Sequence, residues 1–285
     1  MTSYYIQILV NGFGTGMLYL LIVLGFTMIY GIMRVVNFAH GHLYMLGAIF
    51  THVATMMLGM NFWLGLLVSM VLVGLLGIVM EKLIFFPLLD NHTASVVSAI
   101  GSFVFIGGVT EAIMGGQVRG VESAWKGSIR LGGVVISGDR LIVILSALVV
   151  VTLFFLLMKF TKLGRASRAV VDDAEMATVQ GVNVPRAYMV NFGIASALAG
   201  IAGGLVSPVI GAVPAMADPA LMRAFVIVVL GGVGSIPGAI VSGLFLGFFD
   251  STVTTLMSSQ IAEMGAFVMV LILLVFRPLG LFGKA

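Results

Sequence analysis

Four histidines are the side chains of this sequence best suited to metal binding or acid–base chemistry: His40, His42, His52 and His92. His40 and His42 flank Gly41, which would place them on different faces of a helix, so the spacing does not match a metal site. Each histidine could lie at a helix end or the membrane interface, or could belong to a proton relay. The sequence has no cysteine, which excludes a thiol nucleophile and a disulfide framework.

The sequence contains no recognisable enzyme signature. HExxH, GxSxG and P-loop motifs are all missing. We therefore predict no catalytic residues, no bound metal and no cofactor of the chain's own, and the small net charge of +3 gives no reason to expect a nucleic acid partner. The glycine-rich run 231–238 lies between apolar stretches, where a break between two helices is a better interpretation than a phosphate site. The residues of this predicted break are Gly231, Gly232, Gly234 and Pro237.

Charged side chains are concentrated in one segment, 159–186, between two long apolar stretches. Acidic residues followed by a glycine predict a short helix over 172–181. Met176, Ala177 and Val179 would give this helix a small apolar face. Its acidic first turn does not suit anionic lipid, which prefers basic surfaces, so we predict that the segment docks on a soluble protein.

Several polar residues interrupt the apolar stretches. A charge at the centre of a membrane helix costs about 2.5–3.5 kcal/mol on insertion scales, so such residues often mark transport pathways. Asn37 and His40 lie near glycines and Arg34, which predicts an interrupted helix near the inner face of the membrane. For these two residues a place beside a translocation pathway and simple hydrogen bonding between helices both stay open. The other polar residues are Glu111, Asn191 and Asp250, of which Glu111 and Asp250 are expected to approach the outer interface.

The composition predicts the elements that hold these residues. Hydrophobic residues make up 60% of the 285 residues and charged residues 9%, compared with roughly 25% charged in soluble domains. The apolar runs are continuous, so they predict helices of about 20 residues and not the alternating strands of a barrel. We therefore predict an all-α polytopic bundle of eight or nine spans, with a possible half-helix at 221–235, in one transmembrane domain covering 1–285. The predicted spans are 5–30, 41–59, 62–80, 94–116, 141–158, 187–211, 221–235, 238–257 and 262–276. No internal sequence repeat is evident.

Lysine and arginine in the short loops predict the orientation, because cytoplasmic loops are enriched in these residues. With segment 159–186 inside, the N-terminus is expected outside and the C-terminus in the cytoplasm, and the start of the chain does not resemble a signal peptide. Segment 117–140 then becomes an external hairpin or loop, which either links two helices or docks an external partner. The basic residues expected inside are Arg34, Lys82, Lys159, Lys162, Arg165, Arg168, Arg186, Arg277 and Lys284. Those expected outside are Arg119, Lys126, Arg130, Arg140 and Arg223.

Three stretches together resemble the inner-membrane permeases of branched-chain amino acid-type ABC importers. They are VNFAHGHLYMLGA (36–48), LGRASRAVVDDAEMATVQGVNVPR (163–186) and VLGGVGSIPGAIVSG (229–243). The spacing of the spans extends the resemblance to nearly the whole chain. The family also includes importers of urea, short amides and organic acids, so the resemblance does not identify the solute.

The resemblance implies a permease subunit in a bacterial inner membrane, surrounded by lipid. A second homologous permease, commonly non-identical, would complete the pathway, two cytoplasmic ABC ATPases would bind ATP and drive transport, and a periplasmic binding protein would deliver the solute. Segment 159–186 would be the coupling loop that docks on an ATPase, although this sequence has Asp173-Ala174-Glu175 where related importers have a Glu-Ala-Ala motif. The implied coupling residues are Arg165, Arg168, Asp172, Asp173, Glu175, Ala177 and Gly181.

Two other classes of protein compete with this interpretation. A self-sufficient channel or secondary carrier for a small polar solute would need an ion-coupling carboxylate or a polar pore ring, and the chain has few acids in its apolar runs. An intramembrane enzyme would need paired catalytic groups, which the sequence does not offer.

Overall fold

The computed structural model describes residues 2–131 and 134–283, and within them the chain is almost entirely helical. A two-stranded sheet and a few π-helical and 3-10 turns accompany the helices, which agrees with the predicted all-α class. The helices are α1 (Thr2–Met33), α2 (His40–His52), α3 (Phe62–Met80), α4 (His92–Met114), α5 (Gly138–Phe160), α6 (Lys162–Asp172), α7 (Ala174–Val179), α8 (Val184–Ile210), α9 (Ala217–Gly231), α10 (Ile236–Leu256) and α11 (Ser259–Phe276).

Eight helical segments in the described ranges are long and apolar enough to cross a membrane. The predicted span at 41–59 is not among them. Helix α2 has 13 residues, which corresponds to about 20 Å, and the chain then enters a π-helical turn at Val53–Met57. Helix α2 by itself is thus shorter than the roughly 20 residues of a typical span, although the π-helical turn continues the helical run to Met57. The predicted half-helix corresponds to α9, which has 15 residues.

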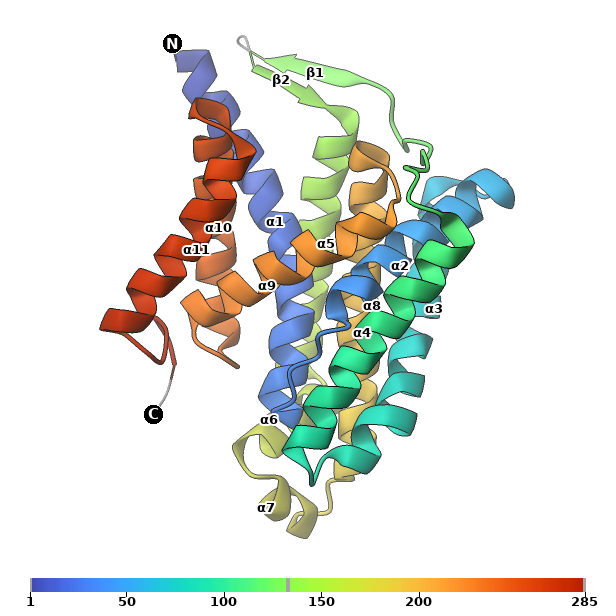
Figure 1. The fold of residues 1–285 in the computed structure, drawn as a ribbon, viewed down its shortest axis with the longest axis vertical. Coiled ribbons are helices and arrows are strands. Elements are labelled where there is room, and N and C mark those ends of the chain that lie inside the picture. Colours follow the sequence, from blue (N-terminus) through green and yellow to red (C-terminus); the bar gives the residue numbers. More distant parts are fainter. Residues whose placement is uncertain (1, 132–133, 284–285) are drawn as a thin grey trace.

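The two short helices belong to a pattern that the sequence does not reveal. Helices α1–α4 and α8–α11 follow one another in similar ways but run in opposite directions, so that α1 descends where α8 ascends (Figure 1). Helix α1 packs on α10 and α3 packs on α8, which are equivalent pairs in such an arrangement. Inverted repeats of this kind are common in transporters, where solute sites lie between the repeats.

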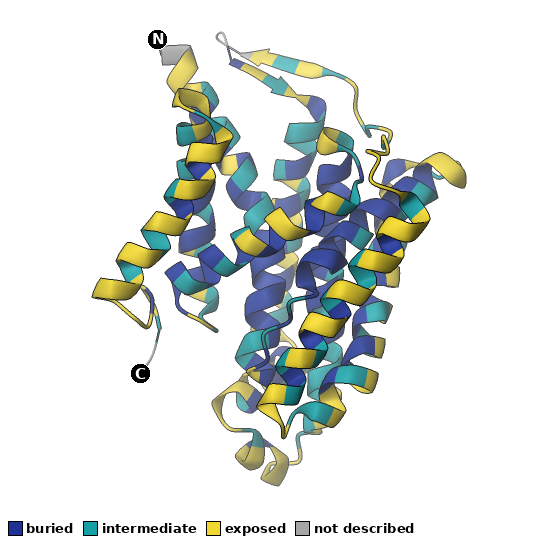
Figure 2. Cartoon of the chain, viewed as in Figure 1, coloured by how far each residue is buried: buried dark blue, intermediate teal, exposed yellow. Residues whose placement is uncertain are grey.

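The core of the bundle is formed by α1, α2 and α8, where buried residues dominate (Figure 2). Small residues allow these helices to approach closely. A Cβ atom on Gly203 of α8 would lie 1.8 Å from the backbone oxygen of Tyr44 in α2, so no larger residue fits there. By contrast, α4 and α11 expose large apolar side chains such as Phe105 and Phe276, as expected for surfaces that face lipid.

A β-hairpin and the segment that bears α6 and α7 lie at opposite ends of the bundle (Figure 1). Strands β1 (Ser128–Leu131) and β2 (Val134–Ser137) pair antiparallel, with Ile129 opposite Ile136. This is the hairpin that the alternating sequence of 117–140 suggests, and its tip at 132–133 lies outside the described residues. The N-terminal end of α1 lies at the same end of the molecule as the hairpin.

Candidate functional site

The charged segment 159–186 forms two short helices instead of the single one predicted. Thr161 caps α6, since its side-chain oxygen accepts a hydrogen bond from the Gly164 N–H at 3.1 Å. Asp173 is extended and caps α7, accepting from the Met176 N–H at 2.9 Å. The acidic start of the second helix is therefore Asp173 at the cap and Glu175 in the first turn, because Asp172 is the last residue of α6.

Helix α7 ends at Gly181 through paired backbone hydrogen bonds. The Gly181 N–H donates to the Thr178 oxygen at 2.9 Å, and the Val182 N–H donates to the Ala177 oxygen at 3.0 Å. This is a Schellman motif, which requires a left-handed residue, and Gly181 has a φ of 83°. A Cβ atom at this position would meet nothing within 4 Å, so the constraint here concerns only the backbone conformation.

The predicted apolar face of this helix is divided between two sides. Ala177 is buried, whereas Met176 and Val179 are 59% and 82% exposed and point away from the bundle. The charged side chains of the segment are exposed as well, and none of them is in an ion pair within the described part of the chain. The exposed charged residues at the implied coupling positions are Arg165, Arg168, Asp172, Asp173 and Glu175.

Helix α6 is attached firmly to α5 and α8. Gly164 packs directly on the backbone of Met158 in α5, and the Arg168 guanidinium donates a hydrogen bond to the Met158 carbonyl. The buried Ser167 hydroxyl donates to Oδ1 of the buried Asn191 in α8 at 2.9 Å. Arg168 thus caps the last turn of α5, and Asn191 joins α8 to α6. A displacement of α6 would be transmitted to both helices.

The chain is interrupted between α1 and α2, in the region of Asn37 and His40. Arg34 has a φ of 53°, and segment 34–39 is not helical. Asn37 Oδ1 accepts from the Ala39 N–H at 3.0 Å, while His40 Nε2 lies 3.0 Å from the Ile22 oxygen of α1. Both side chains are buried inside the bundle, where they stabilise this joint. The prediction that they lie beside a translocation pathway stays a prediction.

A second interruption separates α9 from α10. Gly231 is the last residue of α9, Gly232 and Gly234 have φ values of 98° and 81°, and Pro237 lies in the first turn of α10. The C-terminal segment covers this joint, because the Leu281 and Phe282 N–H groups donate to the oxygens of Leu230 and Gly231 at 2.9 and 3.0 Å. These bonds satisfy the last carbonyls of α9, which the helix itself leaves free.

A cluster of three polar residues inside the bundle was missed by sequence reasoning. The Tyr19 hydroxyl of α1 donates to Asp250 Oδ2 of α10 at 2.6 Å, and Arg223 Nε of α9 lies 3.4 Å from the same oxygen. Arg223 was predicted on the outer side and Asp250 near the outer interface. The two residues lie within candidate spans and form an ion pair with each other there, which neither prediction included, and their depth in the membrane stays a prediction. The sequence does contain a signal for this cluster: two opposite charges, each isolated in one of two neighbouring apolar runs.

Comparison with known proteins identifies the family. Residues 8–276 match the family model described as "Branched-chain amino acid transport system / permease component". The chain belongs to this permease family. The permease is 31% identical to the high-affinity branched-chain amino acid transport system permease protein BraD of Pseudomonas aeruginosa, over 99% of this chain and 96% of the relative. LivH of Escherichia coli is 30% identical, also over 99% of this chain and 96% of the relative. No solved structure matches the permease.

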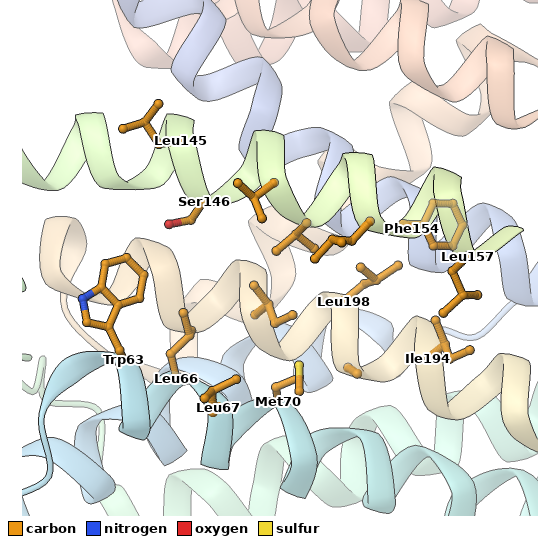
Figure 3. Close-up of a pocket in the computed structure, with 15 residues that line it drawn as sticks. Trp63, Leu66, Leu67, Met70, Leu145, Ser146, Phe154, Leu157, Ile194 and Leu198 are labelled. Atoms are coloured by element: carbon orange, nitrogen blue, oxygen red, sulfur yellow. The ribbon is translucent and has the colours of Figure 1, made fainter. Parts of the chain in front are cut away.

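The permease has an apolar groove between α3, α5 and α8, with a volume of about 810 Å³. Side chains such as Leu67, Met70 and Phe154 line it, and the polar groups among its walls are the Ser146 hydroxyl and the Trp63 indole (Figure 3). No charged side chain lines the groove. It therefore suits an acyl chain or another apolar group and offers no partner for a charged solute.

Proposed function

We propose that this protein is the transmembrane permease subunit of an ABC importer for branched-chain amino acids or a related small polar solute. The observation that carries the proposal is the similarity to BraD and LivH over 99% of the chain. Both relatives are described as permease proteins of high-affinity branched-chain amino acid transport systems. The eight apolar helical segments are what such a subunit needs in the membrane.

The permease would act with partners that perform the other steps. We propose a second homologous permease, two ABC ATPases that bind the ATP, and a periplasmic protein that delivers the solute. The absence of a P-loop from the full sequence supports a division of labour in which hydrolysis occurs on the ATPases. The chain itself would then be a non-catalytic subunit without a cofactor of its own.

We propose that the ATPases drive the permease through α6 and α7, which form the coupling element. Its outer side offers the exposed Met176 and Val179 together with free charges such as Glu175. Asp173 and Gly181 fix the two ends of α7, so the element can act as a rigid projection in an ATPase groove. The contacts of Gly164 and Ser167 then pass its movement to α5 and α8.

This role requires the end of the bundle that bears α6 and α7 to face the cytoplasm, with the hairpin and the N-terminus outside. The distribution of basic residues supports this orientation. Nine were expected inside and five outside, and removing Arg223 from the external set leaves four because Arg223 lies within a candidate span. One of the nine, Lys284, is outside the described residues.

Reconstitution in proteoliposomes tests the proposal. We expect radiolabelled leucine to accumulate only when the permease is assembled with its ATPases, supplied with ATP, and exposed to the binding protein. Assemblies with a hydrolysis-deficient ATPase are the matched control. Uptake by the lone chain without ATP would instead establish a channel or secondary carrier. Asn37→Ala and His40→Ala assemblies would show whether either residue affects uptake, and two variants with unaltered uptake would leave these residues with a packing role.

A further inference from the structure

The cluster of Tyr19, Arg223 and Asp250 joins three helices of the bundle. It links the half-helix α9 to α1 and α10. The other ion pair in the described ranges, Lys126–Glu122, is exposed in the polar segment before the hairpin. Charges within spans are costly, and an apolar pair of similar volume commonly stabilises a protein at least as well as a buried ion pair. Packing alone therefore does not account for the cluster.

The geometry leaves Arg223 with unused hydrogen-bonding capacity. Its two contacts to Asp250, from Nε and Nη1, are 3.4 and 3.5 Å long, well beyond the 2.7–2.9 Å typical of charge-assisted bonds. A guanidinium has five N–H donors, so most of them have no short bond to Asp250. Asp250, in contrast, is held by the 2.6 Å bond from Tyr19. The carboxylate is fixed and the guanidinium is loosely held.

The cluster is also not completely buried. The side chain of Arg223 is 18% exposed and that of Asp250 is 7% exposed. Helix α9 crosses the face turned toward the viewer between α4 and α11, and no other helix of this chain lies over it there (Figure 1). The partial exposure of Arg223 leaves part of its side chain accessible to a small molecule.

We propose that Tyr19, Arg223 and Asp250 form an intramembrane site for the zwitterionic headgroup of an α-amino acid, an inference that rests on the proposed function. Arg223 binds the carboxylate, because the planar guanidinium matches a carboxylate with two parallel N–H donors. Asp250, oriented by Tyr19, accepts hydrogen bonds from the ammonium. The zwitterion enters between two opposite charges, each of which gains a further partner, and the net charge of the site stays zero.

The test uses the complete transporter in proteoliposomes and compares solute uptake with ATP hydrolysis. Arg223→Gln with Asp250→Asn removes both charges and keeps the side-chain shapes. We expect ATP hydrolysis stimulated by the loaded binding protein to stay within about twofold of wild type, while leucine uptake per ATP falls about tenfold or more, as the loss of charge-assisted bonds implies. The matched control, Lys126→Gln with Glu122→Gln, neutralises the external pair and should leave both quantities unchanged.

A charge swap distinguishes a solute site from a structural ion pair, meaning one that only holds α9 and α10 together. Arg223→Asp with Asp250→Arg keeps an ion pair between α9 and α10 but removes the carboxylate to which Tyr19 donates. If the ion pair is only structural, this variant should take up leucine as the wild type does. If the site needs the positive charge on α9 and the negative charge on α10, it should not. Recovery by the swap, or unchanged uptake per ATP in the neutral variant, would overturn the proposal.

Tyr19→Phe provides a milder variant in case the double variants do not assemble. It keeps both charges and removes only the hydroxyl that orients Asp250, so we expect uptake per ATP to fall about threefold or more with unchanged ATP hydrolysis. Normal uptake in this variant would also overturn the site. A wild-type transporter without ATP-dependent uptake would refute the proposed function instead, a result that differs from a loss confined to the variants.

Discussion

Gly181 offers the sharpest test of the coupling element, because its replacement changes the backbone without creating a clash. Gly181→Ala introduces a side chain at a φ of 83°, where a left-handed conformation costs roughly 1–2 kcal/mol, while the new Cβ meets nothing within 4 Å. The whole cost therefore falls on the C-terminal end of α7. A change of 1.4 kcal/mol is about tenfold in an equilibrium, so the equilibrium between the intact and the frayed end of α7 should shift toward the frayed end by about 5- to 30-fold.

The assay for Gly181→Ala is the ratio of leucine taken up to ATP hydrolysed in proteoliposomes. We expect normal assembly and normal basal hydrolysis, but a reduced ratio and weaker stimulation by the binding protein. Gly59→Ala is the matched control, because Gly59 also has a left-handed φ, 66°, with nothing within 4 Å of an added Cβ, and lies outside α6 and α7. An unaltered ratio in Gly181→Ala, or an equal loss in Gly59→Ala, would refute the reasoning.

Three further predictions concern the attachment and the ends of the same element. Asn191→Leu removes the bond to Ser167, worth about 0.5–1.5 kcal/mol, and should lower transport per ATP more than it lowers thermal stability measured in detergent. Asp173→Ala removes the cap of α7 at a cost of about 1 kcal/mol and should weaken ATPase binding in a pull-down assay, whereas Asp173→Asn, which still caps, should bind nearly as well as wild type if the cap and not the charge matters. Gly203→Val should abolish accumulation of the protein in the membrane, as measured by immunoblotting, because its side chain would collide with the backbone of α2.

The local structure could be predicted where the residues of a single segment are enough to determine it. Continuous apolar runs predicted the helical class and most of the spans, because a membrane helix satisfies its own backbone hydrogen bonds. The stop at Gly181 and the cap at Asp173 follow from the preferences of helix ends. One departure within that segment, the place of Asp172, arose because two adjacent acids are equally good candidates for a cap, and only the extended backbone of Asp173 distinguishes them.

The features that escaped prediction depend on contacts between distant segments. Arg223 and Asp250 were both assigned to the outer side because each was considered alone, and their pairing depends on how α9 packs on α10. The close approach of Gly203 to Tyr44 likewise exists only in the folded bundle. The inverted arrangement leaves no repeat in the sequence, because many different apolar residues satisfy the same packing and lipid contacts.

The central claim is that ATP-driven movement enters this permease through α6 and α7. Since the chain has no cysteine, Val179→Cys introduces a unique thiol at a position that is 82% exposed on α7. The decisive measurement is the yield of cross-linking between this thiol and the ATPase subunit in the assembled transporter. We predict a high yield that changes when ATP is added, with no cross-link from Val135→Cys in the hairpin. Absence of the cross-link from Val179→Cys in a transporter that still takes up leucine would contradict the account.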